Sequence, residues 1–190
     1  MTDANADSLG QSLVFRGRLP LAWRELGALP SESERVALAH ANVDTLRALA
    51  VVEAHAVEPG DAAAEPVAQD IARVEFKLNL LLDLMSQLLV SQGMVPEPRA
   101  LSLTPTALHW QDDRKPAEGA LLRIEFYCNP RYPRPLILHG QVNALCAQPE
   151  GWAIDTVFHE IGTSVQEGLE RFIFAHHRRA VAQNRRRQRP

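Results

Sequence analysis

Seven apolar residues between positions 67 and 88 alternate in steps of four and three residues. They are Val67, Ile71, Val74, Leu78, Leu81, Met85 and Leu88. This spacing predicts a helix whose heptad seam has Ile71, Leu78 and Met85 at one core position (a) and the other four residues at the second (d). The seam lasts about three heptads, near the lower limit for a coiled coil. A chain with this segment has to cover its apolar face with another part of the fold or with other copies of itself.

The apolar surface of this helix is wider than the seam. From Leu78 onward it also includes Leu80, Leu82, Leu84 and Leu89, which a two-stranded coil would leave in water. Because burying one such side chain is worth about 1.5–3 kcal/mol, the pattern favours a bundle of several helices. Pro66 suits the first turn of the helix, and Gly93 and Pro96 end it.

A second helix is predicted from Ser31 to about His55. Ser31 and Glu34 form a capping box at its start. One face is expected to carry Val36, Ala39, Val43, Leu46 and Ala50. The break at Glu58–Asp61 leaves two arrangements open: the two helices fold on each other within one chain, or several copies share their apolar faces. Two helices alone cannot cover so wide a face, so either the rest of the fold or other copies cover what remains, and self-association is favoured.

The residues on either side of the helices have the alternation of short strands. A strand is expected over Ser12–Leu19, ended by Pro20. Further strands are expected at 101–104, 107–110, 121–128, 136–144 and 152–158. A last helix, with a capping box at Ser164 and Glu167, should carry Leu169, Phe172 and Ile173 inward. The predicted fold class is α+β: a small antiparallel barrel with a closing helix and an inserted helical hairpin. The segments are 1–28, tail and first strand; 29–96, helical insert; and 97–190, barrel, helix and basic tail.

Composition limits the function classes. The 190 residues carry a net charge of −3, which argues against wholesale binding to nucleic acid or membranes. The N-terminus lacks a secretory pattern, and no apolar run reaches the roughly 18 residues that a membrane span needs. A cytoplasmic location is expected. Nucleic-acid binding through the basic C-terminal tail, and through residues 185–190 in particular, remains an alternative. The arginines of this tail are Arg178, Arg179, Arg185, Arg186, Arg187 and Arg189.

Catalytic patterns are missing. His159-Glu160 begins like a zinc-protease motif, but Thr163 stands where the second histidine is required. The sequence has no Gly-rich phosphate loop and no nucleophile elbow. We therefore expect no enzyme activity, no catalytic or metal-binding residues and no cofactor.

The order of motifs after residue 100 is similar to the PilZ domain family. It consists of a motif strand, a Gly-led strand from Gly119, a Gly-x-Val strand at Gly140–Val142, a strand ending in Phe158 and a helix with Leu-Glu-Arg-Phe-Ile from Leu169 to Ile173. The resemblance implies a barrel that reads cyclic di-GMP. The helical insert resembles that of the atypical, tetrameric PilZ proteins of xanthomonads, in which heptad helices drive assembly.

The family's ligand motifs are eroded in this chain. The resemblance implies an Arg-x-x-x-Arg arm before the first strand and Asp-x-Ser-x-x-Gly after it. Here Ser102, Thr104 and Ala107 take the places of the Asp, Ser and Gly. Arg16, Arg18 and Arg24 lie near the expected arm without its spacing. These six residues are the candidate ligand-binding positions, and losing one bidentate base contact costs about 1–3 kcal/mol.

The sequence therefore predicts a non-enzymatic protein of the cyclic di-GMP pathway. It is expected to be a homo-oligomer, a tetramer by the resemblance, that acts through a protein partner. Cyclic di-GMP binding is expected to be absent, weak or in a non-standard mode. The alternatives are a nucleic-acid-binding protein and a structural assembly factor without a nucleotide.

Overall fold

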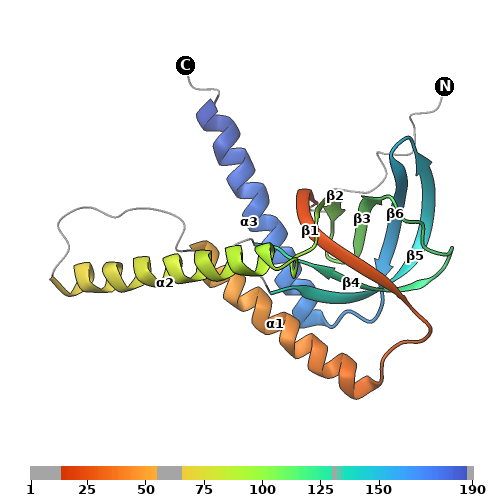
Figure 1. Ribbon diagram of the computed structural model, residues 1–190, viewed down its shortest axis with the longest axis horizontal. Helices are drawn as coiled ribbons and strands as arrows, with labels where there is room; N and C mark the ends of the chain where they lie inside the picture. Colours follow the sequence, from red (N-terminus) through yellow and green to blue (C-terminus); the bar gives the residue numbers. More distant parts are fainter. Residues whose placement is uncertain (1–13, 55–65, 130–131, 133, 188–190) are drawn as a thin grey trace.

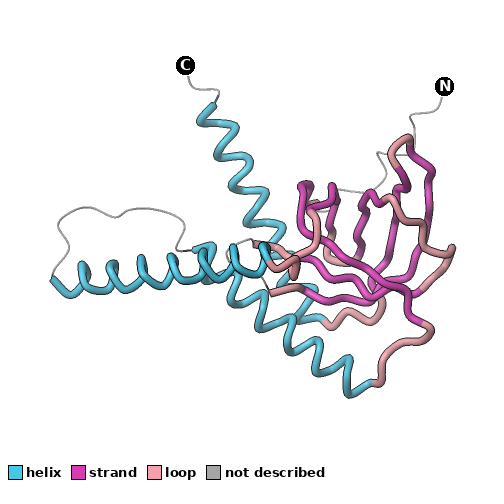
Figure 2. Tube along the Cα trace, in the orientation of Figure 1, coloured by secondary structure: helices cyan, strands magenta, loops and turns pink. Residues whose placement is uncertain are grey.

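The computed structural model describes residues 14–54, 66–129, 132 and 134–187, with the backbone alone for residues 53–54, 66–68 and 183–187. Six antiparallel strands form a closed barrel in the order β1-β2-β3-β6-β5-β4. They are β1 (Phe15–Leu26), β2 (Pro98–Leu103), β3 (Ala107–Asp112), β4 (Leu121–Phe126), β5 (Leu136–Gln148) and β6 (Gly151–Phe158). The helices are α1 (Glu32–Ala54), α2 (Pro66–Ser91) and α3 (Thr163–Arg187). Figure 1 shows α2 and the end of α3 extending away from the barrel, and Figure 2 shows all three helices gathered at one side of the strands.

Alternating side chains fill the barrel. Leu103, Trp110, Leu122, Ile124, Phe126 and Ile154 point inward and are fully buried. Leu169 and Ile173 of α3 are also fully buried, and Phe172 is nearly so. The inward face predicted for the last helix is therefore confirmed, and α3 and the barrel share one hydrophobic core.

β1 continues through Pro20, so the prediction that this proline ends the strand is wrong. Pro20 is the last residue of β1 that pairs with β2, and from Leu21 onward the strand pairs with β4. A proline cannot donate a ladder hydrogen bond, and it is tolerated where a strand changes partner. The Pro20 carbonyl still accepts a hydrogen bond from the backbone N–H of Tyr127 at 3.0 Å.

The capping box at the start of α1 is confirmed. The backbone N–H of Ser31 donates to the Glu34 carboxylate at 2.9 Å, and the Glu34 N–H donates to the Ser31 hydroxyl at 3.4 Å. Hydrogen bonds from the Ser31 hydroxyl and backbone lower the pKa of Glu34.

The buried face of α1 differs from the predicted one. Leu46 is buried as expected, but Val36 is 51% exposed. Asn42, Thr45 and Leu49 are buried instead. The two polar residues can be buried because Asn42 bonds the backbone of Ile137 and the Thr45 hydroxyl donates to the Ala41 carbonyl. Hydrophobic spacing alone does not identify such locally satisfied positions.

α1 packs against α3 and β5 rather than along α2. The arrangement in which the two insert helices cover each other is therefore not found in the described residues. α3 also begins differently from its prediction. It starts at Thr163, and the Gly162 carbonyl accepts from the N–H groups of Val165 and Gln166. Ser164 thus lies inside the first turn and does not form the predicted capping box.

Candidate functional site

Two candidate ligand-binding residues are direct neighbours on the outside of the barrel. Arg16 in β1 lies opposite Ser102 in β2, and Ser102 lies opposite His109 in β3. His109 in turn lies opposite Asp155 in β6, and its Nδ1 is 2.7 Å from a carboxylate oxygen of Asp155. These four residues form the outer row. The outer row places one cation, one hydroxyl and one imidazole–carboxylate pair across four neighbouring strands.

Sequence reasoning found only half of the outer row. His109 and Asp155 alternate with buried neighbours in their strands, which places them on the outer face. That alternation is visible in the sequence, but their adjacency depends on the strand order β2-β3-β6. The signal that could have found them is the alternation combined with a correct topology.

Thr104 and Ala107 form the turn between β2 and β3. The Thr104 N–H donates to the Ala107 carbonyl at 2.9 Å, and the Ala107 N–H donates to the Thr104 hydroxyl oxygen at 2.9 Å. The Thr104 hydroxyl is also 3.2 Å from the Ala107 carbonyl. This hydroxyl therefore stabilises a tight hairpin, which is a structural role that competes with ligand contact.

The structure separates the three candidate arginines. Arg16 and Arg18 are exposed in the part of β1 that pairs with β2. Arg18 donates to the Pro98 carbonyl at 2.8 Å. Arg24 is in the part of β1 that pairs with β4, directly opposite Arg123. Only Arg16 and Arg18 therefore lie beside the eroded motif of β2.

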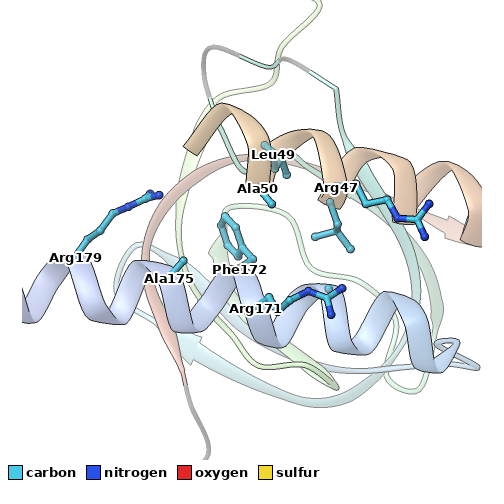
Figure 3. Close-up of a pocket in the computed structure, with 9 residues that line it drawn as sticks. Arg47, Leu49, Ala50, Arg171, Phe172, Ala175 and Arg179 are labelled. Carbon is cyan, nitrogen blue, oxygen red and sulfur yellow. The ribbon is translucent and has the colours of Figure 1, made fainter. Parts of the chain in front are cut away.

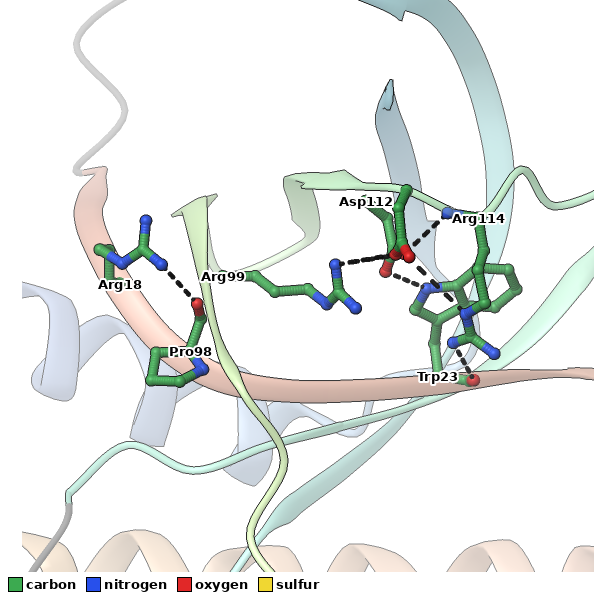
Figure 4. Close-up of polar contacts among 7 residues, drawn as sticks. Arg18, Trp23, Pro98, Arg99, Asp112 and Arg114 are labelled. Atoms are coloured by element: carbon green, nitrogen blue, oxygen red, sulfur yellow. Dashed lines mark hydrogen bonds and ion pairs between the residues drawn. The ribbon is translucent and has the colours of Figure 1, made fainter. Parts of the chain in front are cut away.

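Other arginines near β1 are engaged in a polar network around the buried Asp112 at one end of the barrel (Figure 4). Asp112 is 2% exposed and accepts a hydrogen bond from the Trp23 indole at 2.6 Å. Arg99 lies 3.2 Å from the Asp112 carboxylate, and the Arg114 backbone N–H donates to it at 3.0 Å. The Arg114 guanidinium stacks over Trp23 at 4.4 Å from the ring centroid. Because a buried carboxylate needs partners, we assign this network to stability of the barrel.

A groove of about 350 Å³ lies between α1 and α3 beside their packing contact. Leu49, Ala50 and Phe172 lie between the two helices, with Arg47 and Arg171 toward one end and Arg179 toward the other (Figure 3). The volume is within the range of ligand pockets. An apolar floor with cationic ends suits an amphipathic segment that carries acidic groups.

The heptad seam of α2 is exposed in the single chain. Ile71, Val74, Leu78, Leu81 and Met85 are each between 54% and 58% exposed, and Leu88 is 48% exposed. The side chain of Val67, the first predicted seam residue, lies outside the described part of the structure. Phe76, Leu80, Leu84 and Val90 are exposed as well. So large an apolar surface on one helix marks an interaction site.

The side of α2 that faces its own chain is a different one. Ser86 is buried, and Leu82 and Leu89 are half-buried. These residues do not belong to the seam. The seam is therefore turned away from the residues that α2 contacts in its own chain.

The described residues also bear on metal sites and membrane spans. No group of three or more His, Cys, Asp or Glu side chains there could hold a metal ion. None of the helices in that part of the chain has the length and hydropathy needed to span a membrane. The side chains of the arginine tail, Arg185–Arg187, lie outside the described part.

Comparisons with known proteins bear on these surfaces. The family model of the atypical PilZ domain, described as a cyclic di-GMP receptor, matches residues 46–186. The match begins within α1, so β1 with Arg16, Arg18 and Arg24 lies before it. No curated protein matches the chain.

A similar solved structure is a tetrameric PilZ domain of a pathogenic protein from Xanthomonas campestris, described as self-assembled via an unusual helical bundle. It aligns with a TM-score of 0.71 and 21% identity, over 91% of this chain and 92% of that one. This likeness confirms the predicted PilZ-like barrel with its helices. With the family match over most of its length, the chain belongs to the atypical PilZ domain family of cyclic di-GMP receptors.

Proposed function

We propose that the protein is a non-enzymatic adaptor of cyclic di-GMP signalling that assembles into a homo-oligomer through α2 and acts by protein contacts. The observation that carries the proposal is the exposed seam of α2. Leu78 and Leu81 are 55% and 58% exposed in the single chain, next to further exposed leucines. Each such side chain gains about 1.5–3 kcal/mol on burial, so a bundle of copies is strongly favoured.

The width of this surface supports more than two copies. Exposed apolar side chains extend from the seam to Leu80, Leu84 and Phe76, which a pair of helices would leave in water. Three or more helices around a common axis cover such a face. The relative from Xanthomonas campestris is tetrameric, and we propose the same number here.

We further propose that the usual mode of cyclic di-GMP binding is lost. Ser102 offers one hydroxyl where the family's Asp accepts hydrogen bonds, and Thr104 uses its hydroxyl within the hairpin turn. Nucleotide binding, where it occurs, would use the outer row and Arg18 in a non-standard mode. The apolar groove between α1 and α3 is a further surface through which a protein partner could be contacted.

A mass determination in solution tests the assembly. The wild-type protein should have an oligomeric mass by light scattering. Replacing Leu78 and Leu81 together with Asp should reduce the mass to that of one chain, since charges in an apolar seam oppose association. Gln87→Asp is the matched control, because Gln87 is an exposed residue of α2 outside the seam. A wild-type mass that stays at one chain at high concentration would contradict the proposal.

Calorimetry with cyclic di-GMP tests the ligand separately. Heat that disappears in Arg16→Ala would support binding at the outer row. No heat at high micromolar protein would exclude the non-standard mode and leave the adaptor proposal standing on its assembly.

A further inference from the structure

A second row of basic side chains crosses the opposite part of the barrel wall. Arg24 in β1 lies opposite Arg123 in β4, and Arg123 lies opposite His139 in β5. The backbone N–H of His159, just after β6, donates to the His139 carbonyl at 2.8 Å, which extends the row to a fourth element. Arg35 of α1 lines a cavity together with His139 and His159. Five basic side chains from five parts of the chain thus converge on one place, the basic row.

Acidic side chains neutralise the basic row only in part. Arg123 pairs with Glu125 at 2.8 Å, and Arg35 pairs with Glu160 at 3.1 Å. Arg24 has no ion pair or hydrogen bond among the described residues, so its guanidinium charge is not neutralised by a carboxylate. Like charges directly opposite each other on neighbouring strands are destabilising, as Arg24 and Arg123 are here. An anion at this place would relieve the repulsion.

The side chain of His139 is a second feature, besides the charge of Arg24, that points to a bound ligand. The residue is 6% exposed, and its Nε2 has no hydrogen-bond partner in the described structure. Native proteins leave few buried polar atoms without a partner, and such exceptions call for an explanation such as a bound ion. Burial, followed by the charges of Arg123, Arg35, His159 and Arg24, lowers the pKa of His139. The positive charges that disfavour protonation of this imidazole also favour an anion beside it.

The cavity limits the size of what can bind. Its volume is about 40 Å³, and its lining includes Arg35, Asn42, His139, His159 and Glu160. A single water needs about 10–15 Å³ on this measure, so the cavity has room for one small polyatomic group and not for a nucleobase. Glu160 repels an anion, but its carboxylate is already paired with Nη2 of Arg35. Nη1 of Arg35 donates to the Pro30 carbonyl at 3.2 Å, and the guanidinium group, which has five N–H donors, keeps the others for an anion.

We propose that this cavity binds one phosphate-type oxyanion, held by His139 Nε2 and Arg35 within the positive field of Arg24 and Arg123. The oxyanion accepts a hydrogen bond from the imidazole N–H and a charge-assisted bond from the guanidinium group. The site lies beside β1, β4 and β5, whereas the eroded nucleotide motif lies on β2 and the turn after it. It is therefore independent of the proposed adaptor function.

The test follows the histidine side-chain resonances of the full-length protein by NMR while inorganic phosphate is added to about 10 mM, a range suited to weak single-anion sites. The His139 resonances should shift saturably, and the pKa of His139 should rise, because a bound anion favours the imidazolium form. Chloride at matched ionic strength should give no saturable shift. An equal response to both salts would overturn the proposal.

Variants make the test specific. Arg35→Gln should weaken phosphate binding about tenfold, since it removes a charge-assisted contact. Arg24→Ala should weaken it about threefold through the field alone, and this exposed residue can be changed without disturbing the core. Arg47→Ala is the matched control, because Arg47 lies on the same helix with its guanidinium 3.8 Å from Asp44. Undiminished affinity in both Arg35→Gln and Arg24→Ala would overturn the proposal.

A parallel titration with cyclic di-GMP distinguishes the two sources of a phosphate group. Saturation by inorganic phosphate at the His139 resonances supports a site for a free or terminal phosphate. Saturation of the same resonances by cyclic di-GMP alone would show that the site accepts a nucleotide, and the single-oxyanion proposal would then be wrong.

Discussion

The side-chain amide of Asn42 in α1 forms two hydrogen bonds with the backbone of Ile137 in β5. Its Nδ2 donates to the Ile137 carbonyl at 2.7 Å, and its Oδ1 accepts from the Ile137 N–H at 3.0 Å. Pairing of β5 with β6 begins only at Gly140, so Asn42 satisfies backbone groups that β6 does not reach. The Asn42 side chain thus takes the place of a neighbouring strand at Ile137 and holds α1 against the barrel.

Replacing Asn42 with Ala should therefore be costly. The change leaves the partly buried N–H and carbonyl of Ile137 without partners, and a group left unsatisfied by burial costs about 1–3 kcal/mol. We expect the free energy of unfolding to fall by about 3 kcal/mol in urea denaturation. Asn143→Ala, an exposed change on the same strand, is the control and should have little effect. A loss below about 0.5 kcal/mol would contradict the assigned role, because exposed substitutions already reach that size.

The packing of α1 on α3 depends on Gly168. A Cβ atom at this position would lie 2.6 Å from Cδ1 and 3.3 Å from Cβ of Leu46. Gly168→Val should therefore push the two helices apart and lower the free energy of unfolding by about 1–3 kcal/mol, the usual cost of overpacking. Gly27→Val is the matched control, since a Cβ there meets nothing within 4 Å. Equal thermal midpoints for the two variants would show that the helices do not pack as described.

His139 makes stability depend on pH. Its pKa in the folded protein lies below the ordinary value of 6.5, because burial and nearby arginines disfavour the imidazolium form. As the pH falls through 6.5, the unfolded chain takes up this proton first, so the free energy of unfolding decreases. The decrease should end below the folded-state pKa. His139→Gln should flatten this part of the stability profile, measured by denaturation at a series of pH values, and an unchanged slope would contradict the assignment.

The outer row predicts the effect of restoring an acidic side chain at position 102. Ser102→Asp would place a carboxylate opposite Arg16, and opposite charges on neighbouring strands contribute about 0.2–1 kcal/mol. We expect a gain of this size in the free energy of unfolding, and we expect it to disappear when Arg16 is Ala. A double-mutant cycle measures the coupling. A coupling of zero would mean that the two side chains do not meet.

Much of the fold could be predicted from the sequence, because strand alternation, helix spacing and capping residues are local patterns. Strands β2 to β6 follow from alternation, and the start of α1 follows from Ser31 and Glu34. The heptad spacing of the α2 seam was also visible in the sequence, and its residues share an exposed face of the helix. The predictions that were wrong concern positions where contacts with distant parts of the chain override the local pattern. Pro20 is tolerated because β1 changes partner there, and Asn42 is buried because a strand edge needs it.

The candidate sites were less visible, because they depend on register. Arg24 and Arg16 are close in sequence, yet they lie on different parts of the barrel wall, because β1 pairs with β2 at one end and with β4 at the other. His109 meets Asp155, and Arg24 meets Arg123, only through pairings of strands that are not consecutive in the sequence. No spacing along the chain encodes these neighbours.

The position of β1 in the barrel also constrains the order of events during synthesis. β1 leaves the ribosome first, but its partners β2 and β4 follow only after both insert helices have been made. Helices form from local contacts, whereas strand pairs far apart in sequence form slowly. The α2 seam is therefore available to other nascent chains before the barrel can close. In the proposed oligomer, assembly through this seam can therefore precede closure of the barrel.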